Sequence, residues 1–566
     1  MQTFDYVIVG AGSAGCVLAN RLSANGKFSV CLLEAGPSDR YGWIHLPIGY
    51  AKTMFHKTYN WGFYTDPDPN LNDRKIYQPR GRTLGGSSSI NGLVYVRGQK
   101  SDYDLWAAAG NAGWSWEDCL PYFKKLEHND QGPSATRGVN GPIWASTIPG
   151  NDKLTDAFIA ASRALGVPVV TDFNTGDQEG VGYYQLSTRN GLRCSTAVGY
   201  LKPAKARANL RVETDAHATR IQFQGSQAVG VAYQQNGVAK QVSARREILL
   251  CAGAIQSPQL LQISGIGPSQ LLQKLGIPVV KHAPGVGENF QDHLQVRLMY
   301  EVGEKITIND KMNSLIGRVS MGLQWIATRK GPLSIGINTA GMFCRALPEE
   351  NATPDIQFHF ATVSAEHAAG KVHPFSGCTY SICQLRPESR GHVRINSPDP
   401  FSAPSIQANY LSTELDRRTT VAGVKFAMQV ADTSPIKQLM KRSYRPASTL
   451  QTDDEILSFC REYGTTIFHP SGTAKMGLRT DPLSVVDARL RVHGIAGLRV
   501  VDCSIMPTLV SGNTNIPTIM IAEKAADMIL EDAEGRASAT LVVDPFVHAT
   551  DKKENTPEIA LQAPRT

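Results

Sequence analysis

The sequence predicts an α/β fold in two parts: a parallel sheet with helices on its faces, and a second part built on an antiparallel sheet. Three observations lead to this prediction. A strand, a glycine-rich turn and a helix follow one another over residues 4–22, alternating strands gather between 355 and 395, and a buried strand with a following helix occupies 498–530. Both ends of the chain are therefore expected to build the parallel part.

The N-terminal segment has the pattern of a dinucleotide-binding turn. An apolar strand (4–9) runs into Gly-Ala-Gly-Ser-Ala-Gly (10–15) and a helix, and a second strand (28–33) ends at Glu34, 19 positions after Gly15. Glycines let backbone amides approach a pyrophosphate at a helix N-terminus, and the acid can accept both ribose hydroxyls. The pattern predicts an adenine dinucleotide, either NAD or FAD.

A second glycine-rich loop follows at 81–92, with the sequence GRTLGGSSSING. Its small donors would suit contact with a further part of an extended cofactor. The same composition is also typical of an ordinary surface loop, so composition alone leaves both interpretations open.

His469 is the candidate catalytic residue among the 13 histidines, although a packing, surface or hydrogen-bonding role stays open for it. It lies in a turn of small residues (468–473) that follows an apolar stretch and precedes a strand expected to end at the cofactor crevice. A further turn of small polar residues lies at 511–515. A separate group of histidines and one acid lies earlier in the chain: His359, Glu366, His367 and His373. Their spacing fits no metal-ligand motif, so no metal site is expected.

Composition narrows the class of protein further. The chain is 42 % hydrophobic and 19 % charged, which is typical of a globular protein. Its length of 566 residues suggests three or four domains, or two large ones. The net charge of +7 is spread evenly, so no nucleic-acid partner is expected, and a serine hydrolase is disfavoured because GxSxG is absent. Ten cysteines without CxxC pairs suggest reduced thiols.

The sequence predicts a cytoplasmic protein. Neither a leader-like N-terminus nor an apolar run long enough to span a membrane is visible, although peripheral membrane association stays open. Residues 535–566 are polar and aperiodic and are expected to form a mobile tail.

Four ordered motifs carry a family resemblance. They are GRTLGGSSSIN from Gly81, GAIQSPQLLQISGIG from Gly253, HPSGTAKMG from His469 and VVDCSIMP from Val500. With these motifs the chain resembles the glucose-methanol-choline (GMC) flavoprotein oxidoreductases over residues 4–529, and most closely their choline dehydrogenase and alkanol dehydrogenase branch. The resemblance implies FAD rather than NAD.

The resemblance also implies the domain organisation. A discontinuous, Rossmann-like FAD-binding domain is expected at 1–155, 190–297 and 470–534. A substrate-binding α+β domain on an antiparallel sheet is expected at 156–189 and 298–469.

The cofactor residues carry over by position. They are Gly10, Gly12, Ser13, Ala14, Gly15, Glu34, Ala35, Gly36, Trp61, Arg82, Leu84, Gly85, Gly86, Asn91, Gly92, Leu93, Val94, Ala218, Asp502, Asn515 and Pro517. Certain members link FAD covalently through a histidine at the position of Ile90, so this chain is expected to hold FAD non-covalently.

His469 and Asn513 match the two catalytic positions of the family. The implied reaction oxidises a primary alcohol to an aldehyde: His469 takes the hydroxyl proton, Asn513 orients the oxygen, and hydride passes to flavin N5. Phe468 is expected in the substrate wall. An uncharged aliphatic or aromatic alcohol is favoured over choline, because no cage for an ammonium group can be singled out.

Two points stay open from the sequence. The electron acceptor could be oxygen, a quinone or another carrier. The alternative function is a flavin-containing lyase of the hydroxynitrile lyase type, in which the same histidine would act as a base without net redox chemistry. A flavin-stabilised binding protein is disfavoured, because both His469 and Asn513 are present.

Overall fold

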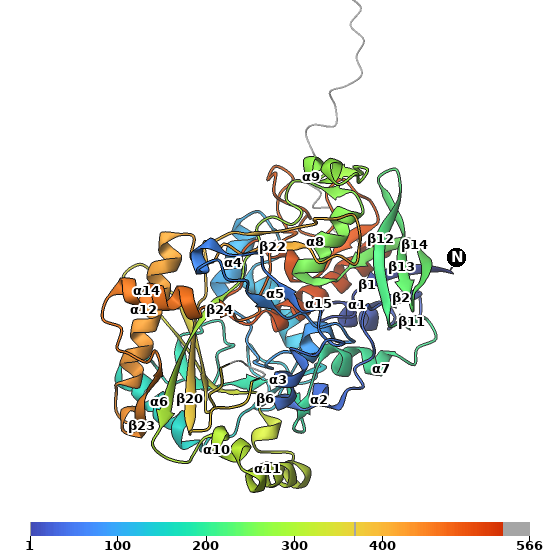
Figure 1. Cartoon of the computed structure of the whole chain (residues 1–566). Helices are drawn as coiled ribbons and strands as arrows, with labels where there is room; N and C mark the ends of the chain where they lie inside the picture. The colour runs from blue at the N-terminus through green and yellow to red at the C-terminus, as the bar shows by residue number, and fades with distance from the viewer. Residues whose placement is uncertain (1, 367–369, 536–566) are drawn as a thin grey trace, which may run out of the picture.

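The computed structural model describes residues 2–366 and 370–535. The predicted tail, apart from Gly535, and His367 lie outside the described residues. The chain forms two adjoining parts, each organised around one large sheet (Figure 1).

The first sheet combines strands from both chain ends and from the middle. Its order is β11 (Leu210–Glu213), β2 (Val30–Leu33), β1 (Gln2–Val9), β14 (Val238–Leu250), β13 (Gln227–Gln235) and β12 (Ala216–Gln224), with β25 (Leu498–Val500) also paired to β14. Strands β11, β2, β1, β14 and β25 run parallel, and β12 to β14 form an antiparallel meander. Strands β2 and β25 are buried along their whole length, as expected for parallel strands covered on both faces.

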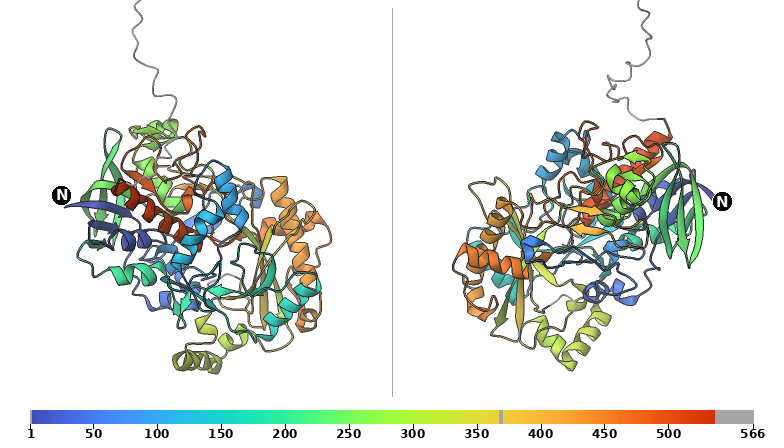
Figure 2. Two further views of the ribbon diagram at one scale, coloured as in Figure 1. Left: turned by 180° about the vertical axis from the view of Figure 1, so that it is seen from behind. Right: turned by 45° about the horizontal axis from the view of Figure 1, so that its top comes forward.

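Two helices close this part of the molecule. Helix α1 (Gly15–Leu22) links β1 to β2, and α15 (Asn515–Ala533) packs against α1 and α5 (Trp116–Leu126). Figure 2 (left) shows α15, in red, beside the blue N-terminal segment. The two ends are tied by buried Glu523, whose carboxylate lies 2.6 Å from Arg21 Nη2 and accepts from Tyr200 OH at 2.6 Å. The prediction that both ends build one fold unit is confirmed.

The second sheet is antiparallel throughout. Its order is β23 (Met440–Arg445), β17 (Leu294–Val302), β20 (Gly377–Gln384), β19 (Ile356–Ala361), β18 (Asn338–Cys344) and β7 (Gly180–Tyr183), and β24 (Thr465–Thr466) also pairs with β17. Helices α6 (Lys153–Ala164) and α12 (Glu414–Ala431) pack against it. The predicted antiparallel sheet is confirmed, with β19 and β20 at the predicted places.

Some boundaries differ from the prediction. Strand β2 begins at Val30 rather than 28, since Val30 is the first residue paired with β1 and β11; the Phe28 ring, just before it, packs edge-on against Tyr6 with centroids 5.4 Å apart. Strand β17 joins the second sheet from Leu294, ahead of the boundary predicted at 298.

The remaining elements are further α-helices and small sheets. The other helices are α2 (Gly42–His45), α3 (Tyr50–Thr53), α4 (Lys100–Ala108), α7 (Lys202–Ala204), α8 (Gly253–Ile263), α9 (Ser269–Lys274), α10 (Ile308–Asn313), α11 (Leu315–Thr328), α13 (Ile436–Leu439) and α14 (Asp453–Tyr463). Small sheets pair β3 (Phe63–Tyr64) with β4 (Tyr77–Gln78), β5 (Glu127–Asn129) with β6 (Ile143–Thr147) and β8 (Gln185–Leu186), β9 (Thr188–Arg189) with β10 (Leu192–Arg193), β15 (Ile266–Gly267) with β16 (Lys281–His282), and β21 (His392–Arg394) with β22 (Ser405–Gln407).

Candidate active site

A cavity lies at the carboxyl ends of the parallel strands. Gly10 follows β1, Glu34 follows β2, and Ala252 and Asp502 lie two residues beyond β14 and β25; all four line it. Carboxyl ends of parallel strands meet at one edge of a sheet, and the connections there leave a crevice where ligands bind. The same cavity extends to His469, beneath the second sheet.

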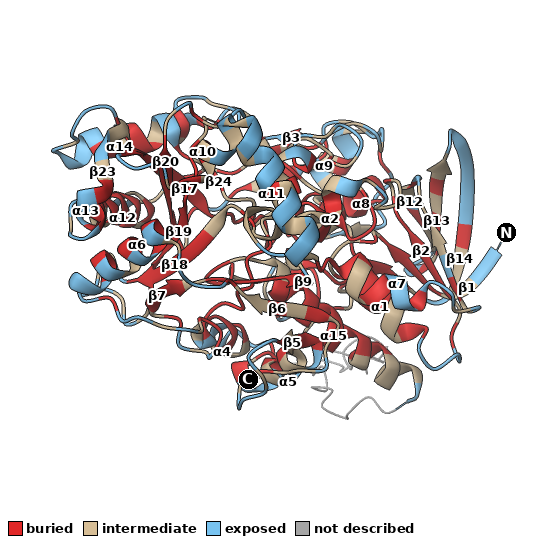
Figure 3. Cartoon of the chain, turned by 90° about the horizontal axis from the view of Figure 1, so that it is seen from below, coloured by how far each residue is buried: buried red, intermediate tan, exposed pale blue. Residues whose placement is uncertain are grey.

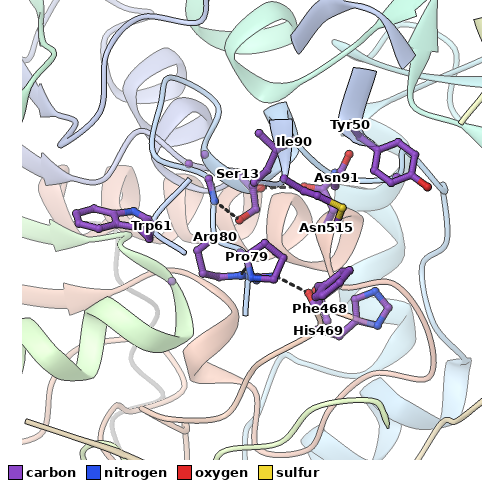
Figure 4. A pocket seen from close by; sticks show the side chains of 18 of the residues that line it. Ser13, Tyr50, Trp61, Pro79, Arg80, Ile90, Asn91, Phe468, His469 and Asn515 are labelled. Atoms are coloured by element: carbon purple, nitrogen blue, oxygen red, sulfur yellow. Dashed lines mark hydrogen bonds between the residues drawn. The ribbon is translucent and has the colours of Figure 1, made fainter. Parts of the chain in front are cut away.

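Two glycine-rich loops form its floor. A Cβ on Gly86 would lie 2.7 Å from the Cα of Gly12, so the loops touch at Gly86, where only glycine fits. A Cβ on Gly12 would meet nothing nearer than 3.9 Å, which leaves its cavity side open to a ligand. Ser13 Oγ donates to Asn515 Oδ1 at 2.8 Å and joins the first loop to the start of α15 (Figure 4).

Glu34 supplies a buried carboxylate at one end of the cavity. It accepts hydrogen bonds from the backbone N–H groups of Ala11 (2.9 Å) and Gly36 (2.8 Å). Burial raises its pKa to about 7, against the opposing effect of these hydrogen bonds. Trp61 lines the same cavity, with the Arg82 guanidinium 5.0 Å from its ring centre.

The structure sorts the predicted cofactor residues into two groups. Those that line the cavity are Gly10, Gly12, Ser13, Ala14, Glu34, Ala35, Trp61, Gly86, Asn91, Gly92, Leu93, Val94, Ala218, Asp502 and Asn515. Gly15, Gly36, Arg82, Leu84, Gly85 and Pro517 are not among the lining residues. Two of these residues pack within the loops instead. A Cβ on Gly15 would lie 1.9 Å from Gly10 O, and Gly85 N donates to Ala11 O at 2.7 Å, so both residues stabilise the loops from the side away from the cavity.

The loop that carries His469 is held by its backbone. His469 N–H donates to Asp292 Oδ1 at 2.8 Å, and Arg80 Nη2 donates to Phe468 O at 2.7 Å (Figure 4). Phe468 has φ +74°, a left-handed conformation that aromatic residues adopt rarely. Phe468 and His469 both line the cavity, and contact of the Phe468 ring with substrate stays a prediction.

The His469 ring takes its tautomer from a chain of hydrogen bonds. His293 Nε2 lies 2.8 Å from Leu385 O, and this carbonyl can only accept, so His293 Nε2 carries the proton. His293 Nδ1 is then an acceptor, and His469 Nδ1, 3.0 Å away, must donate to it. The network therefore leaves the lone pair on His469 Nε2.

Asn513 faces that lone pair. Its Nδ2 lies 3.1 Å from His469 Nε2, and its Oδ1 accepts from Gln357 Nε2 at 3.2 Å. Gln357 thus fixes which end of the Asn513 amide points to His469. The structure brings together the two predicted catalytic residues, which are 44 positions apart in the chain.

The surroundings keep His469 neutral. Burial first, and then the neighbouring His293, His359 and Arg80, lower the pKa of His469 well below its usual value. A neutral imidazole with a free Nε2 lone pair is the form that accepts a proton.

His359 is a site residue that the sequence did not single out for catalysis. It lies on β19, lines the cavity, and its buried Nδ1 has no hydrogen-bond partner among the described residues. Histidine at a buried strand position was the available signal, although buried histidines are common in cores. Of the other metal candidates, His373 Nε2 pairs with Glu366 at 3.0 Å, and the part of the chain described shows no group of three suitable ligands.

Comparison with known proteins identifies the family. A family model described as GMC oxidoreductase matches residues 4–295, and a second of the same description matches 387–522. The chain belongs to the GMC oxidoreductase family. GMC oxidoreductases are FAD-binding flavoproteins, and this chain is an FAD-dependent oxidoreductase that acts on alcohols.

The GMC relatives cover nearly the whole chain. It is 43 % identical to alcohol dehydrogenase [acceptor] of Pseudomonas putida, over 94 % of this chain and 96 % of the relative. It is 42 % identical to mitochondrial choline dehydrogenase of Homo sapiens, over 93 % of this chain and 89 % of the relative. Among solved GMC-like structures, formate oxidase superposes with a TM-score of 0.88 at 27 % identity, covering 94 % of this chain and 99 % of the other. Pyridoxine 4-oxidase from Mesorbium loti gives 0.83 at 30 % identity, covering 92 % and 98 %.

The cavity of this GMC protein suits FAD. Its glycine floor is open beside Gly12, its Glu34 end offers a buried acceptor, and α1 and α15 both begin beside it. Within residues 2–366 and 370–535, none of the helices meets the length and hydropathy needed for a membrane span.

Proposed function

We propose that the protein oxidises an uncharged primary alcohol to the aldehyde, with His469 as the base and Asn513 orienting the oxygen. The observation that supports this most strongly is the hydrogen-bond chain that leaves His469 Nε2 without a proton. Bound FAD would supply the hydride acceptor.

Each residue then has one role. The substrate hydroxyl donates to His469 Nε2 and accepts from Asn513 Nδ2, in place of their mutual 3.1 Å contact. As His469 takes the hydroxyl proton, negative charge grows on the oxygen, and the Asn513 N–H stabilises it. His293, still neutral, accepts from His469 Nδ1 and supports the imidazolium that forms.

The charges of the wall favour an uncharged substrate. Among the described lining residues the carboxylates are Glu34 and Asp502, and both follow strands of the first sheet. Arg297, on the second sheet, lines the catalytic end, and its Nη2 donates to Glu366 O at 2.8 Å. The Glu366 carboxylate is engaged by Arg445 and by Tyr444 OH. A quaternary ammonium would therefore meet a cation without a lining carboxylate to balance it.

We propose that FAD is held non-covalently. Ile90 lines the cavity with a side chain that cannot form the histidyl link of certain relatives. The residues that would hold FAD are the lining residues named above, with the pyrophosphate beside Gly12 and Ser13 and the ribose beside Glu34.

An anaerobic absorbance titration tests the function. The purified protein is mixed with straight-chain alkanols, aromatic alcohols and choline, and the oxidised-flavin band is followed. Bleaching by uncharged alcohols and not by choline is expected. Readmitting air then separates an oxidase, which recovers at once, from an enzyme that needs another acceptor.

Two results would contradict the proposal. Bleaching by choline alone would show that the wall does accept an ammonium group. A flavin that stays oxidised with every alcohol, in a protein that cleaves a cyanohydrin, would establish the lyase alternative.

A further inference from the structure

Helix α11 presents an apolar face to solvent. Five of its large apolar side chains are 54 to 81 % exposed: Leu315, Ile316, Val319, Leu323 and Ile326. At 100° per residue, these five fall within an arc of about 100°. A surface helix normally turns such a stripe towards the core, whereas α11 turns it towards solvent.

The opposite face fixes the helix to the protein. Met321 is buried, and Trp325 Nε1 donates to Gly191 O at 3.0 Å. Ser314 Oγ caps the N-terminus through Gly317 N. The apolar stripe thus faces away from the contacts at Met321 and Trp325, and contiguous exposed apolar patches of this kind mark interaction sites.

Exposed cations are frequent on α11 and on the segments beside it in the chain. Between 305 and 330 the chain carries five exposed cationic residues and one acid, Asp310. The cations are Lys305, Lys311, Arg318, Arg329 and Lys330. Asp310 is engaged, because it accepts hydrogen bonds from Thr307 and from Ser376 Oγ.

The helix adjoins the wall of the catalytic cavity. Ile308 and Met312 of α10 line that cavity, and α10 packs against α11. Figure 1 shows α10 and α11 together at the lower edge of the molecule, and Figure 3 shows α11 as an exposed ribbon across the face seen from below.

We propose that α11 docks this face of the protein onto the surface of an anionic lipid bilayer. An apolar stripe edged by Lys and Arg is the pattern of helices that lie in a membrane interface. The stripe enters the acyl boundary and the cations meet lipid phosphates. Alcohols dissolved in the bilayer then reach the protein beside the α10 wall.

Charge favours lipid over a second copy of the chain. A symmetric dimer through α11 would bring identical surfaces together, so Arg318, Arg329 and Lys330 of both copies would face one another. Anionic headgroups neutralise the same cations.

Vesicle flotation of the FAD-loaded protein tests the proposal. The probes are phosphatidylcholine vesicles with and without phosphatidylglycerol. The wild type should float, and more so with phosphatidylglycerol. Ile316→Gln with Leu323→Gln should lower the partition coefficient about tenfold or more. Arg318→Gln with Lys330→Gln should remove only the gain from phosphatidylglycerol.

The matched control places the same change elsewhere. Leu105→Gln with Val238→Gln alters two exposed apolar residues away from α11, 53 and 57 % exposed, and should float like the wild type. Unchanged flavin absorbance and unchanged turnover of a short, water-soluble alcohol show that each variant is folded.

Three outcomes would overturn the proposal. They are a wild type that stays in solution with both vesicles, an α11 variant that floats as well as the wild type, and a wild-type dimer in size-exclusion chromatography that the α11 variant abolishes. The last would assign the stripe to a second copy of the chain.

Discussion

His293 Nδ1 lies 3.0 Å from His469 Nδ1, and this contact decides which nitrogen of His469 is free. Leu385 O can only accept a hydrogen bond, so His293 Nε2 must carry a proton. His469 Nδ1 then carries the next proton, and His469 Nε2 carries none. We therefore infer that His293 is a positioning residue, which acts through His469.

We expect His293→Leu to slow anaerobic flavin reduction by about 10- to 100-fold, because His469 Nδ1 loses its acceptor and the free lone pair is no longer fixed at Nε2. His293→Asn keeps an acceptor oxygen and should recover part of the rate. A purely structural role would instead lower stability in both variants and leave their rates alike. Reduction at the wild-type rate in His293→Leu would contradict the tautomer assignment.

Removing the base should cost more. We expect His469→Ala to lower the rate of flavin reduction by about 10²- to 10⁴-fold, and Asn513→Ala to lower it by about 10- to 100-fold. FAD content, measured after denaturation, serves as the control for cofactor loss. Turnover of a confirmed alcohol substrate that survives both changes within about tenfold would show that the site is wrongly assigned.

Acid should destabilise the protein through its buried histidines. Burial lowers the pKa of His293 to about 4 and of His359 to about 3. The unfolded chain takes up protons below about 6.5 while these folded histidines do not, so stability present above 6.5 is lost as pH falls. The free energy of unfolding should fall by about 1.4 kcal/mol per pH unit for each histidine between 6.5 and the folded pKa.

Urea unfolding at several pH values between 7.5 and 5 measures this slope. Glu34 has a raised pKa, so its effect on the free energy of unfolding has the opposite sign. The slope of the wild type is therefore compared with that of His359→Gln, in which the Glu34 effect is the same. The variant should show the shallower slope. Equal slopes would mean that His359 is protonated in the folded protein.

FAD affinity should weaken on the acid side of neutrality. The pKa of Glu34 is raised to about 7, and its protonated form is a poorer acceptor for ribose hydroxyls. Between pH 8 and 6 the dissociation constant of FAD should rise by up to about tenfold, measured by FAD fluorescence. Glu34→Gln should bind more weakly at pH 8 and show a flatter profile.

Arg297 should act in substrate selection. Arg297→Gln removes the cation from the catalytic wall, so kcat/KM for choline should rise about tenfold relative to that for an uncharged alkanol. Thermal unfolding checks that loss of the hydrogen bond to Glu366 O leaves the fold intact. An unchanged ratio would mean that the ammonium binds away from Arg297.

Sequence reasoning identified features that depend on neighbouring residues. Gly10 to Gly15 and Glu34 belong to one strand, turn, helix and strand unit, so spacing alone indicated their role. The start of α15 at Asn515 was equally local, because a polar turn and Pro517 precede an apolar run.

What the sequence did not identify depends on tertiary contacts. His293 precedes β17, Gln357 and His359 lie on β19, and only the packing of the second sheet over the cavity brings them to His469 and Asn513. The outward orientation of the apolar face of α11 could not be predicted either, because its periodicity equals that of a helix whose apolar face packs on the core.

The hydrogen bond between Ser13 and Asn515 spans 502 positions of the chain. During translation the glycine turn therefore leaves the ribosome long before its partner helix is made, and the floor of the cavity stays open on that side. The cavity is completed only in the last tenth of synthesis, and until then the faces of α1 and α5 that α15 covers are exposed. A chain cut short before this segment would lack Asn515 and the start of α15, and with them one side of the cavity.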